Sequence, residues 1–192
     1  MNTMPLQVHD IVSAFAQAAE AADPMNAARA VIDEMAKDID AVANALDYLP
    51  GTGGNALQSF YRAPNLSLLK VSFPQGRRTP PHNHGTWATI LVLSGSEKNT
   101  IYLREPDGSL RRSGEKTLGP GDVLPMRADA VHVAECLGDE PAIGLHVYGA
   151  NVLGTTRHMW DPDTLEEQPL DWSLYEGLAK RASAAASAPA GV

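Results

Sequence analysis

The sequence predicts a mainly β domain, built as a sandwich or barrel, with a helical cover at its N-terminus. Through about the first 47 residues, apolar side chains recur at three- and four-residue intervals, which is typical of amphipathic helices. From about Gln58 the pattern changes to short apolar segments separated by turn residues. Strands of this length, at roughly 8–12-residue spacing with turns between them, are typical of all-β sandwiches and barrels.

A chain of 192 residues is most simply one domain with additions at its ends. We expect residues 1–50 to form a helical extension packed on the barrel and residues 51–180 to form the β domain. The final segment, RASAAASAPAGV, is small and polar, so residues 181–192 are expected to be a disordered tail.

Composition limits the classes of partner. The formal net charge of −8 argues against a surface for nucleic acid or anionic membranes. The single cysteine, Cys136, excludes a disulfide bond within the chain and is expected to be a small buried side chain. No apolar run approaches the ~18–20 residues that span a bilayer, and MNTMPLQVHD lacks the regions of a secretory signal. We therefore expect a cytoplasmic protein. The sequence leaves open whether it is a monomer or a homodimer.

Two helices are expected in the N-terminal part. Ile11, Phe15 and Ala18 belong to the apolar stripe of the first. Asp23 is a good N-cap and Pro24 suits the first position of a second helix, which is expected to run to Leu46. Pro50 and the GTGG run after it are expected to end the helical part.

The strands are expected in the β domain between clear turn signals. Apolar, β-branched segments occupy residues 65–73, 87–93, 99–103, 123–126, 131–137 and 142–148. EPDG at residues 105–108 and LGPGD at residues 118–122 are turns between them. The segment RHMWDPDTLEEQPL, residues 157–170, is expected to add a late strand and turn.

Three histidines have the spacing of metal ligands. His82 and His84 lie two residues apart beside an apolar run, so in extended backbone both imidazoles point to the same side. A third histidine, His132, follows the turn-rich segment before residues 131–137. Imidazole suits iron, zinc, copper and nickel alike, so these ligands predict a metal site without choosing the metal.

The same segments carry a family resemblance. Gly76, His82-x-His84 and Gly95, followed by Gly119, Pro125 and His132, resemble the two signatures of the cupin superfamily. HNHGTW, LSGSEKNTIY and AIGLHVYGANV resemble the cysteine dioxygenase family, closest to its bacterial 3-mercaptopropionate dioxygenase branch, over about residues 58–160. TTRHMWDPDTLEEQPL is similar to a set of bacterial cupins related to these enzymes. The resemblance implies a cupin double-stranded β-helix (jelly roll) for residues 51–180.

The resemblance also implies roles for particular residues. Fe(II) would be held by His82, His84 and His132, and Ala88 stands where many cupins place a glutamate ligand. The run Gly144 to Tyr148 matches the family's Ser-x-His-x-Tyr element except at Gly144, so His146 and Tyr148 are the expected catalytic pair.

Two arginines are candidates for binding a substrate carboxylate. Arg62 and Arg157 match regions where this family carries such a residue, and a planar guanidinium can bind a carboxylate through two parallel hydrogen bonds. Arg77, Arg78, Arg111 and Arg112 are expected to be loop or surface charges, and His9 and His158 have no partner at ligand spacing.

The expected function is a thiol dioxygenase that uses dioxygen to convert a small thiol carboxylate to its sulfinic acid. Two alternatives stay open: a metal-dependent cupin oxygenase with a non-thiol substrate, and a non-catalytic cupin that binds a ligand.

Overall fold

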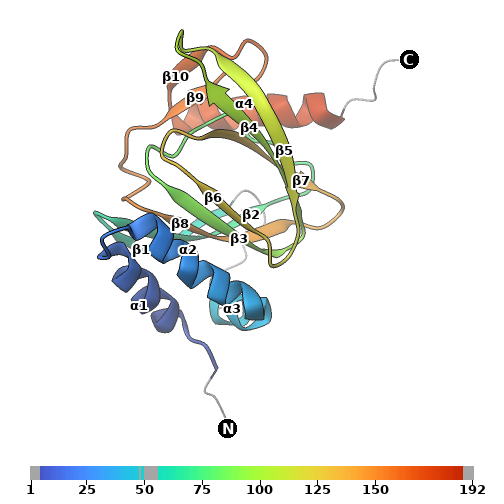
Figure 1. The fold of residues 1–192 in the computed structure, drawn as a ribbon. Helices are drawn as coiled ribbons and strands as arrows, with labels where there is room; N and C mark the ends of the chain where they lie inside the picture. The colour runs from blue at the N-terminus through green and yellow to red at the C-terminus, as the bar shows by residue number, and fades with distance from the viewer. Residues whose placement is uncertain (1–4, 48, 50–55, 188–192) are drawn as a thin grey trace.

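Two β-sheets form the body of the protein, and the N-terminal helices lie against one of them (Figure 1). The computed structural model describes residues 5–47, 49 and 56–187. The strands are β1 (Ala56–Ala63), β2 (Leu66–Phe73), β3 (Ala88–Ser94), β4 (Ser96–Arg104), β5 (Leu110–Leu118), β6 (Val123–Met126), β7 (Val131–Leu137), β8 (Ala142–Tyr148), β9 (His158–Trp160) and β10 (Glu167–Pro169). The helices are α1 (Val8–Ala19), α2 (Pro24–Met35), the 3-10 turn η1 (Ala36–Asp38), α3 (Ile39–Leu46) and α4 (Trp172–Ser187).

The strand pairing is antiparallel throughout and gives a double-stranded β-helix, as the sequence predicted. One sheet has the order β1-β2-β8-β3-β6 and the other has the order β5-β4-β7, with β9 and β10 as a short separate pair. Apolar side chains from both sheets meet between them, among them Leu69, Val71, Ile90 and Ala134. The space between the two sheets is therefore filled by a packed apolar core.

The central strands of the larger sheet are buried on both faces. While Leu69 and Val71 of β2 point into the barrel, Leu68 points outward and packs with Leu91, Leu145 and the helices. The helices contribute Ile11, Phe15, Ile32, Val42 and Leu46 to this second core. This explains why β2, β3 and β8 are so apolar, since a strand covered on both faces needs no polar side. The predicted N-terminal helical cover is confirmed.

The predicted second helix is interrupted. Asp23 caps α2 by accepting a hydrogen bond from the Asn26 amide at 3.1 Å, with Pro24 at the first helical position. Asp38 then caps a new helix, accepting from the Ala41 amide at 3.1 Å, so η1 separates α2 from α3. No helix among the described residues is long and apolar enough to cross a membrane.

The structure adds two elements that were not predicted and changes one expectation. β5 was not predicted, because seven of its nine residues are exposed and give no apolar alternation. Helix α4 was not predicted either, and its last turns occupy residues 181–187, so the expectation of a disordered tail is wrong there. Ala182 packs with 6% of its surface exposed, which holds this part of the helix in place. The expected helix end at Pro50, the boundary between residues 50 and 51, and residues 188–192 lie outside the described residues.

Candidate metal centre

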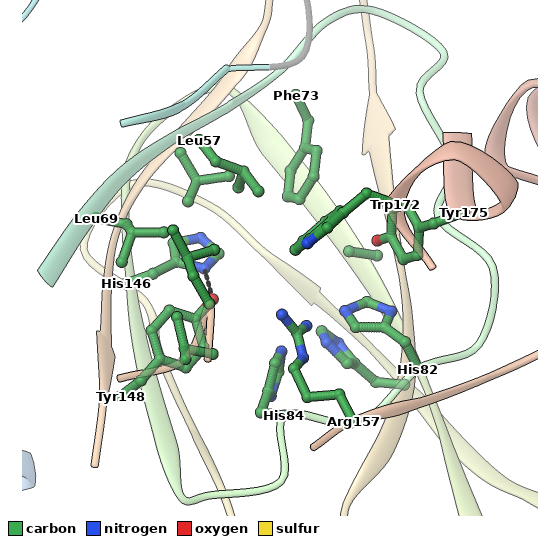
Figure 2. A pocket seen from close by; sticks show the side chains of 15 residues that line it. Leu57, Leu69, Phe73, His82, His84, His146, Tyr148, Arg157, Trp172 and Tyr175 are labelled. Atoms are coloured by element: carbon green, nitrogen blue, oxygen red, sulfur yellow. Dashed lines mark hydrogen bonds between the residues drawn. The ribbon is translucent and has the colours of Figure 1, made fainter. Parts of the chain in front are cut away.

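The three predicted histidines lie close together, and Figure 2 shows His82 and His84 beside the cavity that all three line. His132 lies on β7, while His82 and His84 lie on the extended segment between β2 and β3 rather than on a strand. The backbones of His82 and His132 exchange two hydrogen bonds, each 3.0 Å long, in an isolated antiparallel bridge. This bridge sets one ligand from the connecting segment directly opposite one from the sheet.

The imidazoles are close enough to share one ion. One ring nitrogen from each histidine lies within 4.8 Å of the others, and all three side chains are buried. The ring centroids are 4.6 Å apart for His82 and His132, 5.0 Å for His84 and His132, and 5.3 Å for His82 and His84. Within the described residues, no carboxylate or thiol joins this cluster.

Hydrogen bonds determine which nitrogen of two histidines is available. Nδ1 of His82 lies 3.0 Å from the Pro80 carbonyl oxygen, which only accepts, so Nδ1 carries the proton. Nδ1 of His132 lies 2.8 Å from Oδ1 of Asn99, whose Nδ2 donates to Oε1 of the buried Glu97 at 2.7 Å. In both histidines the proton on Nδ1 leaves the lone pair of Nε2 free for a metal, as is usual for metal-binding histidines.

Two imidazole nitrogens of these histidines have no hydrogen-bond partner among the described residues, although they are fully buried: Nε2 of His132 and Nδ1 of His84. A buried polar atom left without a partner is costly, and a metal ion bound at Nε2 of His132 would satisfy that atom. Burial also lowers the pKa of His82 and His84 well below the usual value and that of His132 to about 3, and the positive charge of Arg157 acts in the same direction. The imidazoles are therefore neutral, and the arrangement fits a metal ion.

His146 and Tyr148 form a hydrogen-bonded pair beside the histidine cluster. Both are on β8, and Nδ1 of His146 lies 3.0 Å from the Tyr148 hydroxyl (Figure 2). The Tyr148 ring lies 5.1 Å from that of His84, centroid to centroid. Burial raises the pKa of Tyr148 above its ordinary value and lowers that of His146 to about 3. The pair is therefore uncharged at neutral pH, and the phenol keeps the proton that it could donate to a ligand.

Gly144 allows the His146 ring to lie where it does. A Cβ atom at position 144 would be 3.1 Å from Nε2 of His146 and 3.1 Å from the Leu91 carbonyl oxygen. Contacts this short require the neighbour to move. The absence of a side chain at residue 144 is therefore coupled to the position of the imidazole two residues later on the same strand face.

The structure separates the two candidate arginines. Arg157 lines the cavity beside the three histidines and is 9% exposed, whereas Arg62 is exposed on β1 and is not among the cavity-lining residues. Gly85 has a φ of +64°, and a Cβ atom there would lie 2.4 Å from the Thr156 carbonyl oxygen. The segment that carries His82 and His84 thus passes very close to the segment that carries Arg157.

Arg157 has no acidic partner in the part of the chain that the structure describes. Its Nε donates to the Asn83 carbonyl oxygen at 3.1 Å, and its Cζ lies 5.5 Å from the centre of the Trp172 ring. Burial lowers the pKa of Arg157, and the groups that act against this shift are the phenols of Tyr148 and Tyr175 rather than any carboxylate. A buried guanidinium without a counter-charge is a natural binding group for an anion.

Several cavity residues were not predicted from the sequence. Trp172 and Tyr175 come from α4, and the Tyr175 ring packs edge-on against His82 at 5.5 Å between centroids. The apolar spacing of Trp172, Tyr175, Leu178 and Ala182, behind an N-capping Asp171, is the signal that could have predicted this helix. Arg77 was expected to be a loop or surface charge; it lies in a loop but is buried, and it forms two hydrogen bonds with Glu176 of α4 at 2.8 and 2.9 Å.

The cavity is small and mostly apolar. Its volume is ≈ 40 Å³, and Leu69, Val71 and Phe73 of β2 form the wall facing the histidines. The exposed side chains of Leu57, Leu153 and Trp172 surround it toward the solvent. The cavity therefore combines apolar walls with the positive charge of Arg157.

Comparison with known proteins finds similar solved structures, two of which are described as double-stranded β-helix proteins. No protein-family model matches the sequence. The chain is similar to an RmlC-like cupin family protein with a double-stranded β-helix fold from Methanocaldococcus jannaschii, at 9% identity and a TM-score of 0.44, over 54% of this chain and 86% of that one. It is similar to the DMSP lyase DddQ from Ruegeria pomeroyi DSS-3 at 20% identity and a TM-score of 0.46, over 57% of this chain and 53% of the lyase. It is also similar to an uncharacterized conserved protein with a double-stranded β-helix domain from Klebsiella pneumoniae. The identity is 18% and the TM-score is 0.41, over 64% of this chain and 89% of that one.

Proposed function

We propose that this protein is a non-haem iron thiol dioxygenase that oxidises a small thiol carboxylate, such as 3-mercaptopropionate or a cysteine-like molecule, to its sulfinic acid. The observation that carries the proposal is the buried Arg157, which lines the same small cavity as three neutral histidines and has no carboxylate partner among the described residues. The cavity thus offers a group that attracts a carboxylate beside a set of imidazoles that can hold an ion for a thiolate.

The ligand set supports a thiol substrate. Three neutral imidazoles leave the full dipositive charge of a ferrous ion in place, whereas a carboxylate ligand would cancel one unit of it. This charge favours binding of an anionic thiolate. Three protein ligands also leave positions on the ion for the substrate and dioxygen. Iron is chosen over zinc, copper or nickel because the sequence resembles iron-dependent dioxygenases, and a ferrous ion supplies the electron transfer that dioxygen chemistry requires.

The reaction needs no further reductant. A thiol and one dioxygen molecule give one sulfinic acid, with both oxygen atoms ending on sulfur and all the electrons that reduce dioxygen coming from sulfur. The protein therefore has to bind the thiol and dioxygen, orient them toward each other and exclude water. The apolar side chains of Leu69, Val71 and Phe73, which line the cavity, support the exclusion of water.

The remaining cavity residues have distinct tasks. Arg157 binds the carboxylate through its terminal amino groups, since its Nε is already engaged by the Asn83 carbonyl. Tyr148 keeps its proton and donates a hydrogen bond to the reacting end of the substrate or to oxygen. His146 holds the phenol in orientation through their shared hydrogen bond.

The metal assignment is tested with His84→Ala. This variant should lose most of its bound iron and its thiol-dependent oxygen uptake while keeping its β-sheet circular dichroism. Elemental analysis measures the metal, and mass spectrometry identifies the sulfinic acid that the wild type forms. Iron-loaded wild-type protein that consumes no oxygen with any small thiol would leave the non-thiol oxygenase or the ligand-binding cupin as the better account.

The substrate class is tested with Arg157→Ala, and Arg62→Ala is the matched control on the surface. The first variant should raise KM for 3-mercaptopropionate by the equivalent of ~2–4 kcal/mol, because a charged hydrogen-bonded partner is lost in a desolvated site. KM for 3-mercapto-1-propanol should stay nearly constant, and Arg62→Ala should change neither. If Arg157→Ala affects the acid and the alcohol equally, the carboxylate assignment is wrong.

A further inference from the structure

Helix α4 closes one side of the cavity. Trp172 and Tyr175, one helical turn apart, both line it (Figure 2). Glu176 on the same helix accepts both hydrogen bonds from the buried Arg77, and Ser183 Oγ accepts from the Arg78 amide at 2.8 Å. Because residues 77 and 78 lead directly to His82, the helix is tied to the segment that carries two of the three histidines.

Trp172 contacts the anion-binding group itself. The Arg157 guanidinium carbon lies 5.5 Å from the centre of its indole ring, within the range of a cation–π interaction. The backbone carbonyl of Asn83 holds the guanidinium at Nε. Among the described residues, these two contacts fix one face and one edge of the group, so its terminal amino groups remain for a ligand.

A second hollow lies beside the first and shares this pair of residues. It has a volume of ≈ 180 Å³, and its lining includes Arg157, Trp172, Thr155 and Leu170. The indole and the guanidinium therefore lie at the boundary between the two spaces. Arginine has many rotamers, and a side chain at such a boundary can turn either way unless a neighbour holds it.

We propose that Trp172 is a positioning residue that holds the Arg157 guanidinium toward the metal-binding cavity, and that it thereby sets the preference for substrates with a carboxylate. The inference rests on the proposed function for the identity of the substrate. Its physical basis is preorganisation, because a side chain already fixed in its binding geometry loses less conformational freedom when the ligand arrives. Trp172 acts through Arg157 and need not touch the reacting atoms.

The test is anaerobic calorimetry on the iron-loaded protein, which measures binding without turnover. The ligands are 3-mercaptopropionate, 3-mercapto-1-propanol and propionate. Trp172→Ala should weaken binding of the two acids by about 2- to 30-fold, the range expected for loss of a cation–π contact, and should barely change binding of the alcohol. Trp172→Phe should restore most of the affinity, because a phenyl ring also attracts a cation.

The matched control is Leu174→Ala, which removes another exposed apolar side chain from the same helix that is not among the residues lining either hollow. It should bind all three ligands as the wild type does, and every variant should keep its iron. If Trp172→Ala weakens binding of the acids and of the alcohol equally, the indole only lines the cavity and the proposal is overturned. Unchanged acid binding, or a wild type that does not prefer the acid to the alcohol, would overturn it too.

The propionate measurement separates this inference from the proposed function. Propionate has no thiol, so its binding depends on the anion site alone. If no thiol supports oxygen uptake, the dioxygenase proposal fails, while the effect of Trp172→Ala on propionate still decides the role of the indole.

Discussion

Nδ1 of His132 donates a hydrogen bond to Oδ1 of Asn99 over 2.8 Å, and Asn99 in turn donates to Glu97 over 2.7 Å. All three side chains are buried. The chain of bonds fixes both the tautomer and the ring orientation of a candidate metal ligand from outside the ligand set. The same hydrogen bonds satisfy polar atoms of Asn99 and Glu97, the two buried polar residues of β4 in this chain of bonds.

Asn99→Ala should weaken metal binding by roughly 10- to 100-fold, the usual cost of removing the partner of a ligating histidine. Competition with a chromophoric chelator measures the affinity. Asn65→Ala, which removes an exposed asparagine outside the cavity, is the control and should bind metal as the wild type does. Wild-type affinity in Asn99→Ala would mean that packing alone orients His132.

Glu97 should make the stability of the metal-free protein depend on pH. Burial raises its pKa in the folded state from 4.5 to about 7, although the bond from Asn99 acts in the opposite direction. Below pH 4.5 both states are protonated, and between pH 4.5 and 7 the unfolded chain ionises while the folded one keeps its proton. The stabilising effect of the buried, protonated carboxyl is therefore lost as the pH rises through this window, by about 3 kcal/mol.

Glu97→Gln removes this titration and can still accept the hydrogen bond from Asn99. Urea unfolding of the metal-free wild type and variant across this pH window should show a smaller decline in the free energy of unfolding for the variant. Parallel curves for the two proteins would contradict the assignment.

Tyr148→Phe should retain iron and lose turnover by roughly 10²–10⁴-fold, the range for removal of a proton-donating group. Tyr61→Phe is the control, because Tyr61 packs among the helices on the outer face of the sheet. Oxygen uptake and metal content are measured on the same preparations. Wild-type turnover in Tyr148→Phe would make the phenol a packing residue.

Gly144→Ala should displace the His146 ring, since the added Cβ would lie 3.1 Å from its Nε2. Overpacking of this kind costs roughly 1–3 kcal/mol of stability, and the bond to Tyr148 should be lost with it. Turnover should therefore fall while iron stays bound. Gly114→Ala, where no atom lies within 4 Å of the new Cβ, should change neither property. Full activity in Gly144→Ala would show that His146 does not need its present position.

The sequence predicted the parts of the site that depend on local pattern. Residues two apart in extended backbone share a side, which was enough to pair His82 with His84 and His146 with Tyr148. It could not choose between Arg62 and Arg157, because that choice depends on how closely the loop after β8 approaches Gly85. Only the folded chain brings Thr156 against that glycine.

The missed residues have a different cause. Asn99 and Glu97 are polar residues in a strand, and polar residues in strands usually face solvent, so their burial is visible only once β4 lies between β5 and β7. Trp172 and Tyr175 belong to a helix in which the apolar positions after Tyr175 are one leucine and several alanines. An apolar stripe this weak is hard to distinguish from a solvated segment in the sequence alone. In the folded chain, Arg77 and Arg78 hold the helix through hydrogen bonds.

The paired backbone hydrogen bonds between His82 and His132 make the ligand spacing a property of the polypeptide itself. The chain should therefore fold first and acquire its ion afterwards, in contrast to small domains that fold only around their metal. A preformed set of imidazoles accepts several divalent ions, and copper and zinc bind such sites more tightly than iron does. The ion found in any preparation will then reflect which metals the producing cells supplied, so reconstitution under controlled metal supply has to precede any judgement of activity.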